Sequence, residues 1–295
     1  MPTTAAPPRA VAIGDLIALA KPQITTLVVF TTAVGLWLAP VQLSWPRIAL
    51  TLAGTVLIVA AANALNMYLE RDTDALMART ANRPLPAGRM DPAVALKFGV
   101  GLAAVSVPML TLFVGALPGL LASSALIIYV LLYTPLKRRS STALLVGGVP
   151  GAIPPLIGWT AATGRLEVTG VLLFAVMFLW QVPHFLAITL FRKEEYAKAG
   201  LVVQPNEPGG EQAARMNIVR YSVALLGVSL LFVPLKTAGW LYFWAAMATG
   251  TAFSVHGLMG LKADSGRKWA RGLFLHSLVY LTVLFAILLA DKIRP

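Results

Sequence analysis

Oxygen-donor side chains recur at four-residue spacing in one stretch of the sequence, at the end of a strongly apolar segment. Asn66, Glu70 and Asp74 are each four residues apart. Residues at this spacing lie on one face of a helix, because a helix has about 3.6 residues per turn. A hard cation such as Mg²⁺ takes oxygen ligands, usually one or two carboxylates together with substrate phosphates. The spacing therefore predicts a stripe of one amide and two carboxylates that could hold Mg²⁺.

Arginines and prolines follow this stripe directly. Guanidinium groups bind phosphate through charge-assisted, fork-shaped hydrogen bonds, and proline ends a helix. Carboxylates for a metal followed by arginines for phosphate are what a diphosphate site requires. The alternative is a solvated, salt-bridged loop between two membrane helices. The residues concerned are Arg71, Arg79, Arg83 and Arg89, with Pro84 and Pro86 between them.

The elements that must position these residues are membrane helices. The chain has 295 residues, is 58% hydrophobic and carries only 12% charged residues, about half the charged share of a soluble domain. Repeated apolar runs of about 20 residues predict an all-α polytopic membrane protein. The absence of cysteine from the sequence excludes disulfides, thiolate metal sites and cysteine nucleophiles.

Nine spans are predicted, in a single domain over residues 21–295 that follows a polar N-terminal lead over residues 1–20. The lead contains no signal-peptide core, so the first span is expected to stay uncleaved. The expected spans are residues 24–40, 45–69, 93–115, 117–133, 142–162, 168–191, 218–235, 240–261 and 272–290.

The distribution of positive charge gives an orientation. Nineteen of the 24 Lys and Arg residues fall on one side of the nine spans and five on the other. Under the positive-inside rule, the N-terminus and the long connections are cytoplasmic, and the C-terminus lies outside a bacterial-type inner membrane. Charge placed in alternate loops indicates topology and no nucleic-acid partner, despite a net charge of +12. No charged residue falls deep inside a span, which disfavours an ion-coupled transporter.

A second group of candidate residues follows the sixth span. Glu194, Glu195 and Tyr196 lie in the stretch RKEEY. A carboxylate pair that faces the first set could hold a second metal, and two-metal clamps suit diphosphate leaving groups. The alternative is a solvated helix end, which is a common reason for a run of charges.

The fourth and fifth spans supply further candidates. Tyr133, Lys137 and Arg138 lie in their connection, where the cations could cover a diphosphate or serve only as a positive-inside anchor. The fifth span contains GGVPGAIPP. Glycine and proline in a membrane helix allow close packing or kinks beside a cavity.

A histidine within the sixth span is a candidate functional residue. His184 follows Trp180 and Gln181 in the stretch WQVPHF. Ionisable residues within a span are rare and mark functional sites. His184 could ligate a haem iron or bond to a neighbouring helix.

These motifs resemble those of the UbiA superfamily of intramembrane prenyltransferases. The pattern Asn-x-x-x-(Asp/Glu)-x-x-x-Asp followed by Arg-Thr-x-x-Arg-Pro-Leu is similar to the first signature of that superfamily. The form with Glu70 and Arg71 resembles the branch that farnesylates protohaem IX, and the similarity extends from about Lys21 to Gly200. It is carried further by KPQITTLVVFTTAVG at Lys21, YTPLKRRS at Tyr133, GGVPGAIPPLIGW at Gly147 and WQVPHF at Trp180.

The resemblance implies a bundle of nine helices around a central cavity, and it also implies substrates and residue roles. Farnesyl diphosphate is expected to bind through Mg²⁺, and the vinyl group of haem B to accept the farnesyl group within the lipid bilayer. Asn66, Glu70, Asp74 and Lys137 would be catalytic, and the first three would hold the metal with Glu194 and Glu195. The family usually has Asp where this chain has Glu195, which keeps the charge and lengthens the side chain. Substrate contacts are expected from Arg79, Arg83, Tyr133, Arg138, His184 and Tyr196.

Two other functions compete with this interpretation. A related enzyme could prenylate an aromatic acid such as 4-hydroxybenzoate with the same metal chemistry. A haem transporter or assembly scaffold would also need a cavity and histidines, but not paired carboxylates with arginines at one membrane edge. Haem A synthase or a terminal-oxidase assembly would be the protein partners that the resemblance suggests.

Overall fold

Helices make up nearly all of the regular structure of the protein. The computed structural model describes residues 12–41, 43–262 and 264–293. Within these residues there are no β-strands, and the only β-type pairing is an isolated bridge between Ala238 and Lys292. The predicted all-α fold is therefore confirmed.

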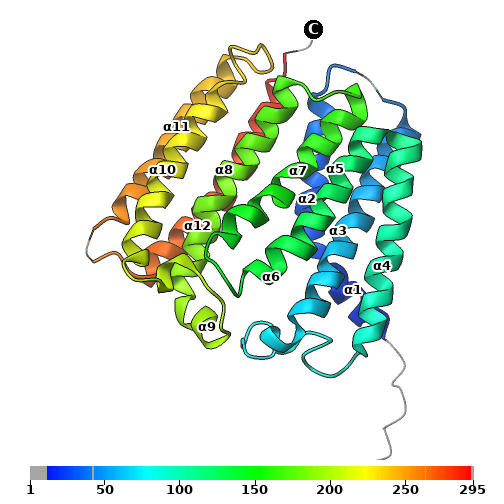
Figure 1. The fold of residues 1–295 in the computed structure, drawn as a ribbon. Helices are drawn as coiled ribbons and strands as arrows, with labels where there is room; N and C mark the ends of the chain where they lie inside the picture. Colours follow the sequence, from blue (N-terminus) through cyan, green and yellow to red (C-terminus); the bar gives the residue numbers. More distant parts are fainter. Residues whose placement is uncertain (1–11, 42, 263, 294–295) are drawn as a thin grey trace, which may run out of the picture.

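The long helices run side by side in a bundle, as Figure 1 shows. Two helical runs contain a π-helical segment. In the first, α4 continues into the π-helix η1, and in the second, α5 continues through the π-helix η2 into α6. The elements are α1 (Ile13–Ala20), α2 (Pro22–Leu38), α3 (Trp45–Asp74), α4 (Pro92–Pro108), η1 (Met109–Val114), α5 (Ala116–Ile127), η2 (Ile128–Tyr133), α6 (Thr134–Leu136), α7 (Ala143–Thr163), α8 (Val168–Phe191), α9 (Lys193–Lys198), η3 (Gln204–Asn206), α10 (Gly210–Leu230), α11 (Trp240–Met259) and α12 (Arg267–Ala290).

Six of these helical segments are long and apolar enough to cross a membrane, and a bent pair makes a seventh. The bent pair is α1 and α2, which meet at an angle of 47°. The remaining long helices, α10 and α11, have similar lengths, but their sequences mix apolar residues with charged or small polar ones. The predicted number of nine spans is therefore approximate.

Two predicted boundaries need correction. The helix expected over residues 218–235 is α10, which begins at Gly210 and ends at Leu230. The helix expected over residues 272–290 begins earlier, at Arg267. In α10 the early start brings in Glu211 and Arg215, which pair with each other at 2.9 Å. Hydropathy alone places a helix start too late when charged residues in its first turns are neutralised by partners.

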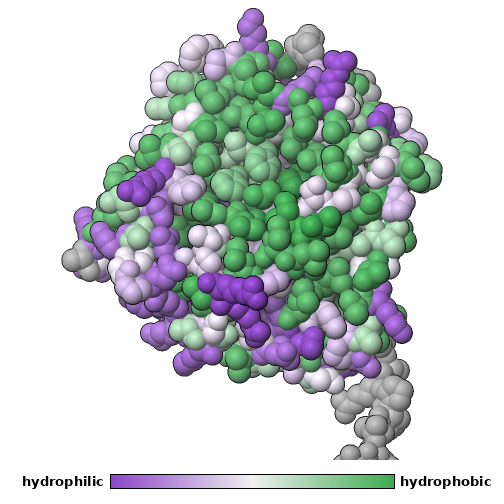
Figure 2. Space-filling view, in the orientation of Figure 1, coloured by the Kyte–Doolittle hydropathy of each residue, from purple (hydrophilic) through white to green (hydrophobic). Residues whose placement is uncertain are grey.

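Polar connections gather at one end of the bundle, which we call the polar end. It is formed by the connections 75–91, 137–142, 192–209, 260–262 and 264–266, in the lower part of Figure 1. In the same orientation, hydrophilic side chains form the lower rim, and apolar side chains cover most of the face above them (Figure 2). This distribution is typical of a bundle whose middle faces lipid.

Two glycines let α2 and α7 lie against each other without side chains between them. A Cβ atom at Gly158 of α7 would collide with the carbonyl oxygen of Thr32 in α2. A Cβ atom at Gly35 of α2 would collide with the carbonyl of Pro155 in α7. The predicted use of small residues for close helix packing is thus seen in the fifth span. This contact ties the N-terminal helices to the centre of the bundle.

Candidate functional site

The last turns of α3 carry the predicted oxygen donors to the polar end. Asn66 and Asp74 are each only 1% exposed, and the Glu70 side chain is 13% exposed. Asp72, two residues from Asp74, is 78% exposed and pairs with Arg71 at 3.8 Å. The helix therefore turns one amide and two carboxylates inward and leaves the third carboxylate outside.

Each of the three inward-facing side chains has a cationic partner from a different part of the chain. Lys137 Nζ lies 2.7 Å from Glu70 Oε1, and an Arg83 guanidinium nitrogen lies 2.6 Å from Asp74 Oδ2. A lysine at the start of the first span, Lys21, donates a hydrogen bond of 3.2 Å to the amide oxygen of Asn66. Acidic groups and cations thus alternate in one compact site.

The connection after α6 closes over this site. Lys137 Nζ lies 4.4 Å from the centroid of the Tyr133 ring, a cation–π distance. Arg138 donates a hydrogen bond of 2.6 Å to Thr73 Oγ1. The Thr134 hydroxyl accepts a hydrogen bond of 3.1 Å from the Asn66 amide. Tyr133, Lys137 and Arg138 therefore reach the α3 site.

The Tyr133 ring packs directly against a glycine of α7. A Cβ atom at Gly147 of α7 would overlap its ring, and the Tyr129 ring lies 5.2 Å away, centroid to centroid. Tyr133 is also the last residue of the π-helix η2. π-Helical turns are rare and frequently occur at functional sites.

The metal-binding capacity of the site can be judged from its free oxygen atoms. The cations contact only one oxygen of each carboxylate, and Glu70 Oε2 and Asp74 Oδ1 make no hydrogen bond within the described residues. Two carboxylate oxygens, with the Asn66 amide oxygen beside them, match the ligand type of Mg²⁺. The residues present therefore fit a divalent cation that is shared with substrate phosphates.

The predicted second acidic set lies on α9, close to the connection after α3. Glu195 pairs with Arg192 at 2.7 Å and accepts a hydrogen bond of 3.4 Å from the backbone N–H of Arg79. Burial raises the pKa of Glu195, but these hydrogen bonds and the two arginine charges outweigh it and hold the pKa below 4.5. Tyr196 packs against Met77. α9 thus anchors the loop that follows the α3 site.

The two acidic sets do not merge into one cluster. Among the described residues, no three His, Asp or Glu side chains lie close enough together to hold a metal ion. Glu194 is exposed and lines an open cleft at the polar end. A second metal held by Glu194 and Glu195 therefore stays a prediction.

His184 lies deep in the bundle, on α8. It is 8% exposed, and its Nδ1 lies 2.7 Å from Ser277 Oγ of α12. Its ring centroid is 4.7 Å from that of Trp180 and 4.8 Å from that of Phe274. The second ring nitrogen, Nε2, makes no hydrogen bond within the described part of the chain. The structure thus places His184 between α8 and α12, beneath a cleft at the polar end.

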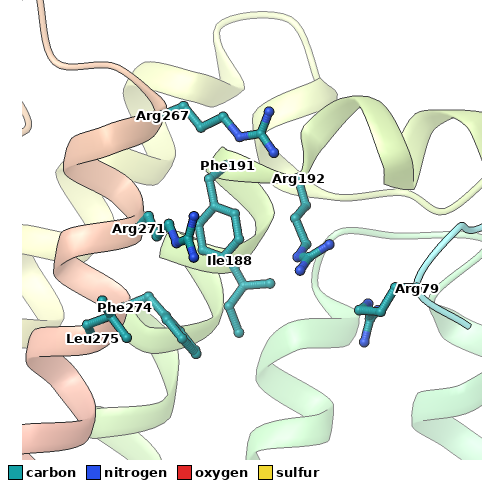
Figure 3. A pocket seen from close by; sticks show the side chains of 8 residues that line it. All are labelled: Arg79, Ile188, Phe191, Arg192, Arg267, Arg271, Phe274 and Leu275. Atoms are coloured by element: carbon teal, nitrogen blue, oxygen red, sulfur yellow. The ribbon is translucent and has the colours of Figure 1, made fainter.

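That cleft, which we call the arginine cleft, has a volume of about 420 Å³. Arg79 lines it instead of joining Arg83 at the α3 site. Figure 3 shows its guanidinium opposite that of Arg192, with two further arginines on α12. The lining residues are Arg79, Ile188, Phe191, Arg192, Arg267, Arg271, Phe274 and Leu275.

Sequence reasoning missed three of the cations at the polar end. Lys21 is separated from Asn66 by 45 residues, and its only signal is a charge placed just before an apolar span. The φ of Lys21 is 48°, in the left-handed region, and Pro22 begins the next helix. The helix is therefore interrupted between α1 and α2. Arg267 and Arg271 belong to a basic turn that the topology alone explains. Only the packing of α12 against α8 reveals that they share a cleft with Arg79.

Comparison with known proteins places the chain among membrane prenyltransferases. The model of the UbiA prenyltransferase family matches residues 28–279. Protoheme IX farnesyltransferase of Myxococcus xanthus (strain DK1622) is 53% identical over 280 residues, covering 95% of both chains. The protein of the same name from Sorangium cellulosum (strain So ce56) is 56% identical over 243 residues, which covers 82% of this chain and 86% of that one.

Solved structures share the fold at low sequence identity. A structure of digeranylgeranylglyceryl phosphate synthase superposes with a TM-score of 0.82 at 16% identity, covering 96% of this chain and 99% of that one. A UbiA homologue from Archaeoglobus fulgidus bound to GPP and Mg²⁺ gives a TM-score of 0.62 at 14% identity, covering 93% and 99%. These likenesses support the same arrangement of helices.

Proposed function

Because this chain belongs to the UbiA prenyltransferase family, we propose that it transfers a farnesyl group from farnesyl diphosphate to the vinyl group of haem B in an Mg²⁺-dependent reaction. The products are haem O and diphosphate. The observation that carries the proposal is the α3 site, where Glu70 and Asp74 each face a cation. Each also keeps a second oxygen that accepts no hydrogen bond from the described residues. Relatives that cover 95% of the chain carry the name of this activity.

The diphosphate of the donor binds at the α3 site. Lys137, Arg83 and Arg138 provide positive charge from two connections, and Lys21 provides it from the start of α2. Asn66, Glu70 and Asp74 would hold Mg²⁺, and the metal would supply positive charge next to the diphosphate. The lysine and arginine side chains stabilise the negative charge that grows on the leaving oxygen as the C–O bond breaks.

The allylic cation that remains is captured by the acceptor. The terminal vinyl carbon of haem B bonds to the first farnesyl carbon, and water adds to the resulting porphyrin-attached cation with loss of a proton. One water is consumed and one diphosphate is released for each haem O formed. An apolar cavity between the helices keeps water from the first cation until the new C–C bond has formed.

His184 is proposed to position the haem. An imidazole ligand typically has its other ring nitrogen hydrogen-bonded, which fixes the tautomer and the ring orientation. The contact between Nδ1 and Ser277 leaves Nε2 available for the haem iron. We expect His184→Ala to weaken haem binding and to leave the affinity for farnesyl diphosphate unchanged. His276→Ala is the control, because His276 of α12 contacts His256 of α11 and not His184. Normal haem binding by His184→Ala would refute this role.

The proposed location is a bacterial-type cytoplasmic membrane with the polar end in the cytoplasm. The support is the excess of Lys and Arg in the connections of that end. This orientation places the diphosphate site on the side where a soluble diphosphate donor would be available. Chemical labelling of single cysteines introduced into residues 75–91 and 231–239 of the cysteine-free chain would test it.

A competition between acceptors tests the proposed reaction. Purified protein in detergent receives farnesyl diphosphate and Mg²⁺ with equal concentrations of haem B and 4-hydroxybenzoate, and the products are identified by mass spectrometry. We expect farnesylation of haem B alone. Farnesylated 4-hydroxybenzoate with unchanged haem would move the assignment to an aromatic acceptor. Haem retained by the protein with neither acceptor modified, beside an active reference enzyme, would favour a transporter or scaffold.

A further inference from the structure

The arginine cleft joins a cationic rim to an apolar floor. Four of its eight lining residues are arginines, and the other four are Ile188, Phe191, Phe274 and Leu275. In Figure 3, Arg267 and Arg271 project from α12, and Arg192 lies across from them at the end of α8. The cleft is large enough to take a substantial part of a small-molecule ligand.

The two arginines of α12 have no polar partner among the residues that the structure describes. Among the described residues, the Arg267 and Arg271 side chains make neither an ion pair nor a hydrogen bond, whereas Arg192 pairs with Glu195. None of the described residues that line the cleft is acidic. Carboxylates do line the neighbouring cleft, which shares Arg192 and Arg267, but Arg271 lines only the arginine cleft. The cleft therefore favours an anionic ligand.

The floor of the cleft leads to His184. The Phe274 ring lies 5.9 Å from the Phe191 ring and 4.8 Å from the His184 imidazole, centroid to centroid. Contacting aromatic rings thus connect the wall of the cleft to the proposed iron ligand. Phe191 and Phe274, which line the cleft, suit a flat aromatic ring system, because its faces can stack on them.

The ligand with these properties is a porphyrin that carries carboxylates on one edge. Haem B is a flat apolar disc with two propionate groups side by side, so it offers two negative charges at one edge and an apolar body. The diphosphate donor has its own cations around α3, whereas α12 packs against α8, α11 and α2. Planar guanidinium groups are well suited to carboxylates, which they bind through paired hydrogen bonds.

We propose that Arg267 and Arg271 bind the two propionates of the haem acceptor. The macrocycle then extends from the polar end along Phe274 toward His184. This inference rests on the proposed function, because it assigns the acceptor subsite of that reaction. It gives the basic start of α12 a role in substrate binding besides topology.

Equilibrium binding without the donor separates this inference from the reaction itself. Full-length protein in detergent is titrated with haem B and with haem B dimethyl ester, whose propionates are uncharged, and binding is followed by visible absorbance. The proteins compared are the wild type, the double variant R267Q/R271Q, and K268Q. Lys268 is the matched control, since it lies on the same turn, is exposed and does not line the cleft.

We expect the wild type and K268Q to bind haem B about tenfold more tightly than the ester, a factor that fits two exposed carboxylate pairs. In R267Q/R271Q this ratio should fall to about one, through weaker binding of haem B alone. Partition of the ligands into micelles is the same for all three proteins and does not affect the comparison.

Three outcomes would overturn the inference. The first is an unchanged ratio in the double variant, and the second is an equal loss in K268Q, which would reveal a general effect of charge. The third is a higher KM for farnesyl diphosphate with haem binding unchanged, which would assign the cleft to the donor. Wild-type protein that shows the expected ratio but does not farnesylate haem B would contradict the proposed function and leave the propionate site in place.

Discussion

Replacing Asp74 by Asn separates the charge of this carboxylate from its shape. Asp74 is 1% exposed and lies 2.6 Å from an Arg83 nitrogen. The amide keeps an oxygen for Arg83, so the fold should survive, but it removes the negative charge that a divalent cation needs. Asp72→Asn is the matched control, since Asp72 is on the same helix and its side chain is 78% exposed.

The expected effects on stability and on activity differ greatly in size. A hydrogen bond to a charged group contributes about 1.5–3 kcal/mol, and part of it persists with the amide. We therefore expect about 1 kcal/mol lower stability, or a Tm lower by about 2–4 °C. Removing one electrostatic contact to a transition state lowers kcat by about 10²–10³, and a weakened metal ligand adds to this loss. Asp72→Asn should change neither quantity by more than about twofold or 1 °C.

The assay is the initial rate of haem O formation across a range of Mg²⁺ concentrations, together with thermal unfolding in detergent. Asp74→Asn should need more Mg²⁺ for half-maximal rate and should stay far below the wild-type rate at saturation. The reasoning would be refuted by equal rates for Asp74→Asn and Asp72→Asn. It would also be refuted if the loss of rate only followed a loss of folded protein.

Three further substitutions test other parts of the structure. Lys137→Gln should lower kcat by about tenfold or more, because it removes a cation from the leaving diphosphate. The control is Arg139→Gln, at an exposed position, which should leave the rate unchanged. Equal losses of rate in the two variants would show that only overall charge matters. Gly158→Ala should destabilise the protein by about 1–3 kcal/mol, because the new methyl group forces α7 away from α2. Gly227→Ala, where the new methyl group meets nothing within 4 Å, should be neutral or stabilising in thermal unfolding. The opposite order of stability would contradict the packing described. The pKa of Glu195 is lowered by its hydrogen bonds, so its contact stabilises the fold at neutral pH and is lost only as the pH falls through a value below 4.5. The Tm difference between wild type and Glu195→Gln should therefore shrink with acidification. A constant Tm difference would argue against this contact.

Local spacing made part of the site predictable. Asn66, Glu70 and Asp74 lie on one helix, so their common face follows from helix geometry alone. Tyr133, Lys137 and Arg138 were predicted from their place in a basic connection and from the resemblance, and the structure brings them to the same site. Apolar runs likewise indicated most helices, because lipid requires every backbone group to bond within its own helix.

Long-range packing accounts for what the sequence did not reveal. The contact between Lys21 and Asn66 depends on the break between α1 and α2, which no periodic pattern announces. Arg79 was expected beside Arg83, but the turn after α3 directs it to the arginine cleft instead. The early start of α10 depends on ion pairs of Glu211 with Lys193 and Arg215. Each of these features is set by residues from another part of the chain.

The central claim is an Mg²⁺-dependent farnesylation of haem, and the mass of the product tests it most directly. Purified wild-type protein in detergent receives haem B and farnesyl diphosphate, with Mg²⁺ or with EDTA, beside an active reference enzyme. We expect a new pigment heavier than haem B by one farnesyl group plus one hydroxyl group, formed with Mg²⁺ and absent with EDTA. No new pigment, or the same amount in EDTA, would contradict the account.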